Sequence, residues 1–130
     1  MTMLNKILIG ILLSSSTVVA LAGTVPVDLY RGGNSTSPRM DNVREQDIIW
    51  YLNDGQQWVV GKKGGISTTS KPPVPGKNWW KIAKGTKYSD EIYLENDHDN
   101  HWRWAPAKNM SRSHFKSLMQ DLHPKFKKIN

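Results

Sequence analysis

The chain has 130 residues, a formal net charge of +7 and no cysteine. This length suits one small domain, and the absence of cysteine excludes disulfides, thiol nucleophiles and thiolate metal sites. The basic balance favours anionic partners such as nucleic acid, dinucleotides, anionic lipid or acidic protein, without choosing among them.

Residues 1–22 have the pattern of a secretory signal. Lys6 supplies the positive start, residues 7–13 the apolar run and residues 20–22 the small-residue cleavage site. The run is shorter than the roughly 20 apolar residues that span a bilayer, although an uncleaved N-terminal anchor is the alternative. Cleavage leaves a single domain, residues 23–130, without a transmembrane segment, in a secreted or periplasmic location.

Short strands and turns are predicted for the first part of that domain. Residues 25–31 alternate in character and favour a strand that ends at Gly32. Residues 66–69 favour another short strand. The three prolines within residues 71–76 predict a loop, because proline cannot donate to a strand ladder.

The segment between these strands is ambiguous. Asp41 can cap a short helix that continues to about Tyr51. Residues 48–52 can equally form a strand that turns at residues 53–55 into a second strand, residues 57–60. The Asp-Gly pair in this turn favours the hairpin.

The second half predicts two more strands and a helix. Residues 92–95 and 101–104 favour strands around a turn at residues 96–100, whereas residues 79–82 form a short element of uncertain type. Together these elements predict an α+β fold, mostly strands with one or two helices.

The closing helix is amphipathic. Ser111 or Ser113 can cap its start and Pro124 ends it. Its apolar stripe recurs at i, i+3, i+4 and i+7 and consists of Phe115, Leu118, Met119 and Leu122. A solvated basic tail is expected to follow at Lys125, Lys127 and Lys128.

Three separated motifs resemble a known family. Residues 29–33 resemble the first-strand signature of the arginine class of mono-ADP-ribosyltransferases, and residues 65–70 resemble its Ser-Thr-Ser strand. His101 and Trp102, followed by Pro106, Met110 and the helix, resemble the end of small bacterial ADP-ribosyltransferase toxins typified by a type VI secretion effector. The resemblance covers about residues 29–122. It implies a compact ADP-ribosyltransferase-like split β core with NAD as the substrate.

The resemblance also implies roles for individual residues. Cleavage of the nicotinamide–ribose bond passes through an oxocarbenium-like sugar, which needs a grip on the phosphates, a grip on the nicotinamide amide and a nearby negative charge. The implied catalytic residues are Arg31, Ser67, Glu95 and His101. The implied NAD-binding residues are Tyr30, Arg31, Gly32, Thr68 and Trp102.

The acidic part of the family pattern differs in this chain. The arginine class carries a Glu-x-Glu or Gln-x-Glu pair on a late strand, and the sequence contains no such pair. Glu91 and Glu95 are the remaining candidates for a catalytic carboxylate. Ala105 occupies the position beside Pro106 where the resemblance leads us to expect a glutamate.

His101 is open to three interpretations. It can bond a ribose hydroxyl or the pyrophosphate of NAD, it can be a structural histidine, or it can join His98 and Asp99 on a metal. The turn spacing differs from the helical i, i+4 spacing of a zinc site, so we assign no metal.

The sequence therefore predicts an exported toxin-like mono-ADP-ribosyltransferase or NAD glycohydrolase. Its expected partners are NAD, an unidentified macromolecular acceptor and a cognate immunity protein. One alternative is a small basic secreted ribonuclease, favoured by the net charge and four histidines. Another is a catalytically inactive domain that binds nucleic acid or glycan through aromatic and basic side chains.

Overall fold

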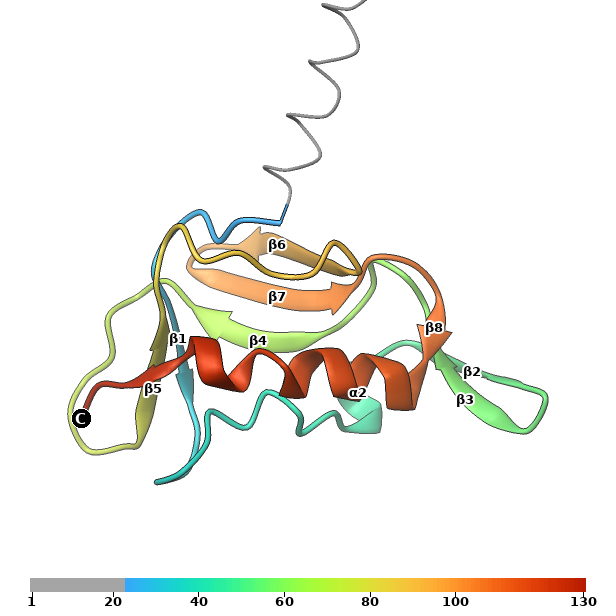
Figure 1. Ribbon diagram of the computed structural model, residues 1–130, viewed down its shortest axis with the longest axis horizontal. Coiled ribbons are helices and arrows are strands. Elements are labelled where there is room, and N and C mark those ends of the chain that lie inside the picture. Colours follow the sequence, from blue (N-terminus) through green and yellow to red (C-terminus); the bar gives the residue numbers. More distant parts are fainter. Residues whose placement is uncertain (1–22) are drawn as a thin grey trace, which may run out of the picture.

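The computed structural model describes residues 23–130, which form two antiparallel sheets and one α-helix (Figure 1). The larger sheet has six strands in the order β6-β7-β4-β1-β5-β9, and the smaller has three in the order β2-β3-β8. The strands are β1 (Leu29–Gly32), β2 (Trp50–Asn53), β3 (Gln56–Val59), β4 (Ile66–Thr69), β5 (Trp79–Ile82), β6 (Ile92–His98), β7 (His101–Pro106), β8 (Met110–Ser111) and β9 (Lys127–Lys128). The helices are α2 (Arg112–Gln120) and the 3-10 turns η1 (Glu45–Asp47) and η2 (His123–Lys125).

The C-terminal helix confirms the predicted amphipathic element and the α+β class. Ser111 caps α2, since its Oγ accepts a hydrogen bond from the main-chain nitrogen of His114 at 3.2 Å. Phe115, Leu118 and Met119 are buried, and α2 lies along one face of the larger sheet (Figure 1). Leu122 follows the helix end and is still buried at 2% exposure, so the apolar stripe extends past the last helical turn.

Trp104 of β7 lies at the centre of the core. Its indole is fully buried, and Tyr88 packs edge-on against it with ring centroids 5.3 Å apart. The indole Nε1 donates to Thr68 Oγ1 at 3.0 Å, so the buried donor is satisfied. The tryptophan-rich sequence thus fills this face of the sheet without any disulfide.

Strand β4 separates the core from the opposite face of the larger sheet. Ile66 and Thr68 are buried, whereas Ser67 is exposed and Thr69 is half-buried. This alternation is the ordinary two-residue period of a strand. It places the hydroxyl of Ser67 on the face away from α2, where the neighbouring β7 carries His101.

Hairpin β2–β3 confirms the predicted reading of residues 48–60. Its strands pair from Trp50–Val59 to Asn53–Gln56. The two turn residues, Asp54 and Gly55, have φ of 53° and 78°, the conformation of a two-residue hairpin turn. The hairpin projects beyond the end of α2 (Figure 1).

Two predicted elements differ from the structure. The first strand begins at Leu29 rather than Val25, because the preceding residues are tied to a loop: Val25 N donates to Thr86 O at 2.9 Å, and Asp28 Oδ1 accepts from Lys84 N at 2.9 Å. The basic tail is exposed as predicted at Lys125, Lys127 and Lys128, but part of it also has a regular structure. Lys127 and Lys128 form β9 at the sheet edge beside β5, which settles the type of the Trp79–Ile82 element as a strand.

Gly65, the residue before β4, lies close to the main chain of β7. Its φ is 125°, and a Cβ built there would lie 2.3 Å from the main-chain oxygen of Trp104. Only glycine combines this φ with that approach. The start of β4 is thereby fixed against β7.

The predicted signal, residues 1–22, lies outside the described residues. Within residues 23–130, no helix has both the length and the apolar character to cross a membrane.

Candidate active site

A shallow hollow of about 210 Å³ lies where β1, β4, β5 and β7 meet on the face away from α2. It brings together Tyr30, Arg31, Gly32, Ser67 and His101, which the sequence predicts as site residues on three separate motifs. Thr68, Thr69 and Trp79 complete its lining. Glu95 and Trp102, also predicted site residues, do not line it.

Arg31 of β1 is among the residues that line the hollow. Its guanidinium donates to three main-chain oxygens, those of Pro38 (3.1 Å), Ser67 (2.8 Å) and Arg39 (3.0 Å). No carboxylate in residues 23–130 forms an ion pair with it. Partial burial lowers the pKa of Arg31, and the nearby negative charge of Asp47 offsets part of this change. A guanidinium has five N–H donors, so these three bonds leave two of them unused.

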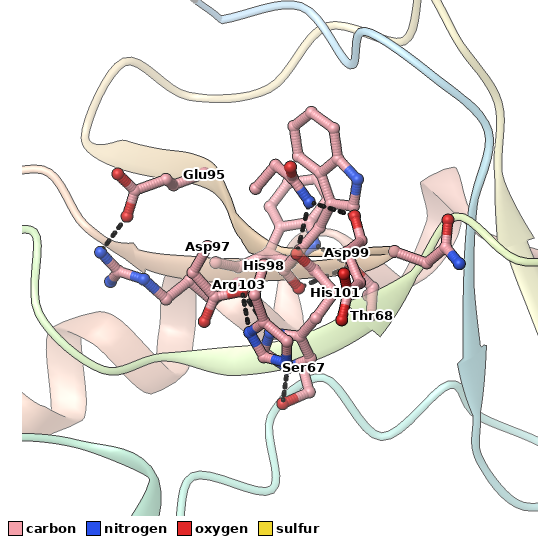
Figure 2. A network of polar contacts seen from close by, with 12 residues as sticks. Ser67, Thr68, Glu95, Asp97, His98, Asp99, His101 and Arg103 are labelled. Atoms are coloured by element: carbon pink, nitrogen blue, oxygen red, sulfur yellow. Dashed lines mark hydrogen bonds and ion pairs between the residues drawn. The ribbon is translucent and has the colours of Figure 1, made fainter.

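Ser67, His101 and Asp97 form a chain of hydrogen bonds (Figure 2). Ser67 Oγ lies 2.9 Å from His101 Nε2, and His101 Nδ1 lies 2.5 Å from Asp97 Oδ1. A carboxylate only accepts, so Nδ1 donates to Asp97. In the neutral ring Nε2 then accepts the proton of the Ser67 hydroxyl. This arrangement gives the hydroxyl a base and the base an orienting carboxylate.

Asp97 carries negative charge at neutral pH. Desolvation raises the pKa of its carboxyl group, but the hydrogen bond from His101 and the charges of His101 and His98 outweigh this effect and leave the pKa below the usual value of 3.8. The site therefore contains an anion behind the imidazole. The sequence motifs do not mark Asp97 as a site residue, because the segment 96–100 suggests a turn, whereas Asp97 lies within β6.

His98 stacks on His101 with ring centroids 4.8 Å apart and planes inclined by 21°. Its Nδ1 lies 3.3 Å from Asp97 Oδ1. The carboxylate beside the two imidazoles is thus Asp97, whereas the metal interpretation of the sequence uses Asp99. Asp99 has a φ of 45° in the β6–β7 turn.

The two glutamates that the sequence offers as catalytic candidates are engaged elsewhere. Glu95 forms an ion pair with Arg103, its direct neighbour across β6 and β7 (Figure 2). It also accepts a hydrogen bond from the hydroxyl of Tyr93. Glu91 pairs with His114 of α2 at 2.9 Å. Neither carboxylate borders the hollow.

Ala105 occupies a buried position beside Pro106, where the family resemblance leads us to expect a glutamate. Its side chain is fully buried. A carboxylate at this position would be removed from water, which is costly without a partner. A glutamate at this position would therefore need a buried partner for its carboxylate.

Thr68 and Trp102, which the resemblance implies as NAD-binding residues, make their side-chain contacts in the core. Thr68 is 3% exposed, and its hydroxyl donates to Trp102 O at 3.0 Å while it accepts from Trp104. The half-buried Trp102 side chain packs against the core cluster. Trp102 therefore supports the site from the core without lining the hollow, whereas Thr68 lines the hollow but has its hydroxyl engaged inside the core.

A second hollow of about 220 Å³ adjoins the first. The two share Thr69 and Trp79, and the second is also lined by Lys71, Pro73 and Val74 among others. Trp79 pairs with Gly32, the last residue of β1, and a Cβ built on Gly32 would lie 3.9 Å from the Trp79 ring. The sequence singled out neither Trp79 nor Lys71, because a Trp-Trp pair of uncertain structure gives no indication of which indole reaches a site.

A family model described as Tse2 ADP-ribosyltransferase toxin matches residues 13–128. The chain belongs to this family. The Tse2 family model confirms the resemblance drawn from Arg31, the Ser-Thr-Ser strand and the His101 region, and it makes the protein a member of a family of ADP-ribosyltransferase toxins for which NAD is the implied substrate. No curated protein and no solved structure gives a significant match.

Proposed function

We propose that this Tse2-family protein binds NAD with its nicotinamide riboside half in the hollow beside Arg31 and cleaves the nicotinamide–ribose bond. The ADP-ribose passes to a macromolecular acceptor or, as in a glycohydrolase, to water. The convergence of Arg31, Ser67 and His101 on one hollow carries the proposal, because these residues lie on strands that are distant in sequence.

The chemistry of the bond matches these groups. Nicotinamide is cationic in NAD and leaves as a neutral molecule, so a strong general acid is not required, while the ribose develops positive charge. The carboxylate of Asp97 stabilises this charge through His101. Arg31 retains two N–H donors for the pyrophosphate, which a planar guanidinium binds well.

The second hollow supports binding of the rest of the dinucleotide. The first hollow alone is smaller than the roughly 300–1,000 Å³ of typical ligand pockets, but Trp79 connects it to the second. In this arrangement Trp79 offers a flat apolar surface to a ring of NAD, and Lys71 offers a positive charge to a phosphate.

The two-sheet arrangement supports the finer fold proposal, an ADP-ribosyltransferase-like split β core. Its six-stranded and three-stranded sheets are joined through β7, β8 and α2. Export to the periplasm or medium through residues 1–22 is also a proposal. The family match begins at residue 13, inside that segment.

The test is release of nicotinamide from NAD by the purified chain. Wild type should release it, and His101→Gln should reduce the rate by roughly 10²–10⁴ as expected for loss of a positioned base. His114→Gln is the matched control, because this histidine lies on α2 and pairs with Glu91 away from the hollow. Absence of NAD cleavage at millimolar NAD would refute the proposal, and cleavage of a model RNA without NAD would favour the ribonuclease.

A further inference from the structure

We propose that Ser67 is itself an acceptor of ADP-ribose, so that the protein modifies its own site. This inference rests on the proposed NAD cleavage and adds a modification site to it. It starts from the position of the Ser67 hydroxyl, which lines the hollow where the ribose is proposed to bind.

Ser67 is the hydroxyl of this strand that has a base. Its Oγ lies 2.9 Å from His101 Nε2, and Asp97 holds the opposite ring nitrogen. The neighbouring hydroxyls are occupied by other groups. Thr68 donates to a main-chain oxygen inside the core, Thr69 Oγ1 accepts from Lys71 N, and Ser70 Oγ bonds Asn100.

The orientation of the imidazole is fixed by two independent contacts. Nδ1 is held by Asp97, and the ring stacks on His98. In addition, the main-chain oxygen of Ser67 accepts from Arg31. The hydroxyl, its base and the cation proposed to bind the pyrophosphate are therefore held in one frame, which is the requirement for attack on a bound substrate.

The transfer step balances without a further reactant. Ser67 Oγ forms a bond to C1 of the nicotinamide ribose as the bond from C1 to the nicotinamide nitrogen breaks. The electron pair of the broken bond neutralises the pyridinium, and neutral nicotinamide leaves. The hydroxyl proton passes to His101 Nε2, and the carboxylate of Asp97 stabilises the imidazolium that results.

The product should persist. The new bond joins ribose to a serine alkoxide, which is a far poorer leaving group than neutral nicotinamide. Reversal or hydrolysis would require a general acid to protonate Oγ while water attacks C1, and the bulky ADP-ribose now fills the hollow. We therefore expect one ADP-ribose per chain and a rate of NAD cleavage that declines as the modified fraction grows.

The experiment incubates the purified full chain with NAD and measures nicotinamide release and intact mass in the same sample. The expected result is a mass increase of one ADP-ribose on the peptide that contains Ser67. The linkage should resist neutral hydroxylamine, which releases ADP-ribose from carboxylate esters. Ser67→Ala should lose the adduct, whereas Ser70→Ala, the matched control three residues later, should keep it.

Further variants test the relay. Asp97→Asn and His101→Gln should slow adduct formation by roughly 10²–10⁴. Ser67→Thr retains a hydroxyl and should form some adduct, which keeps the test valid if Ser67→Ala fails to fold.

The outcomes separate the two proposals. NAD cleavage with no adduct, or with the adduct on another residue, overturns the assignment of Ser67 and leaves the proposed function standing. Absence of NAD cleavage by wild type overturns both. A hydroxylamine-sensitive adduct would place the modification on a group other than a serine hydroxyl and would also overturn the assignment.

Discussion

The guanidinium of Arg31 donates a hydrogen bond to the main-chain oxygen of Ser67, with Nη1 and O 2.8 Å apart. The same side chain reaches Pro38 O and Arg39 O. Arg31 therefore links the end of β1 to β4 and to the loop that follows β1. A residue expected only to contact substrate also holds the walls of the hollow together.

Arg31→Lys should reduce both stability and NAD cleavage. Lysine has a single nitrogen and cannot reproduce three bonds from a planar fork. We expect the free energy of unfolding to fall by about 1–3 kcal/mol, since hydrogen bonds that involve a charged group contribute on that order. Urea unfolding followed by tryptophan fluorescence measures this loss. Arg39→Lys, whose main chain alone contacts Arg31, should behave as wild type, and equal losses in both variants would contradict the prediction.

Thr68→Val should destabilise the protein more than Thr68→Ser. Valine leaves the buried Nε1 of Trp104 without an acceptor, and an unsatisfied buried donor costs about 1–3 kcal/mol. Serine retains the hydroxyl and loses only a methyl group. Thermal unfolding of the two variants gives the comparison, and a Thr68→Val protein as stable as Thr68→Ser would show that the indole donor finds another partner.

Glu95→Gln and Asp97→Asn should affect NAD cleavage very differently. Glu95 is paired with Arg103 outside the hollow, so we expect less than about a tenfold change in its variant. Asp97 orients His101, so its variant should lose roughly 10²–10⁴. Steady-state nicotinamide release gives both rates. The reverse order would restore Glu95 as the catalytic carboxylate that the sequence suggests.

The stabilising effect of Asp97 should disappear in acid. The folded-state pKa of Asp97 lies below the unfolded value near 3.8, so its contribution is fully present above that value and is lost as pH falls through the folded-state pKa. Unfolding curves of wild type and Asp97→Asn should differ by a constant amount near neutral pH. The difference should shrink below about pH 3.8, and a difference that persists in strong acid would rule out the carboxylate as its cause.

Signal cleavage can be checked directly. If residues 1–22 act as a secretory signal, the exported protein expressed in a bacterium should begin at Gly23. Intact mass of the periplasmic fraction measures this start. Replacement of Ala20 and Ala22 by bulky residues should block processing. Recovery of the whole chain from the cytoplasm alone would contradict the prediction.

The local sequence was sufficient for elements bounded by strong signals. The strand at residues 66–69 follows Gly65 and precedes a proline-rich loop, and the hairpin contains an Asp-Gly turn, so both could be predicted. The segment before Leu29 could not. Its alternating pattern suits a strand, but its hydrogen-bonding groups are taken by the loop at Lys84 and Thr86, a partner that only the tertiary fold provides.

The candidate site was predicted in part for a similar reason. Motifs on β1, β4 and β7 indicated Arg31, Ser67 and His101, and the fold brings them together. Asp97 was missed because the pairing of β6 and β7 is irregular between Asn96 and His98. This irregularity re-aims side chains relative to a regular strand. Residue spacing alone therefore gives no indication that Asp97 faces His101.

Gly65 does not line the hollow, yet a side chain at this position would collide with the main chain of Trp104 on the strand that carries His101. We expect any side chain at this position to displace Trp104 and β7. His101, which lies three residues earlier on the same strand, would then move as well. Screens for loss of toxicity should consequently recover substitutions at position 65 that leave every reactive group intact. Such variants would be folded but inactive, although the substitution replaces only one hydrogen atom of the glycine.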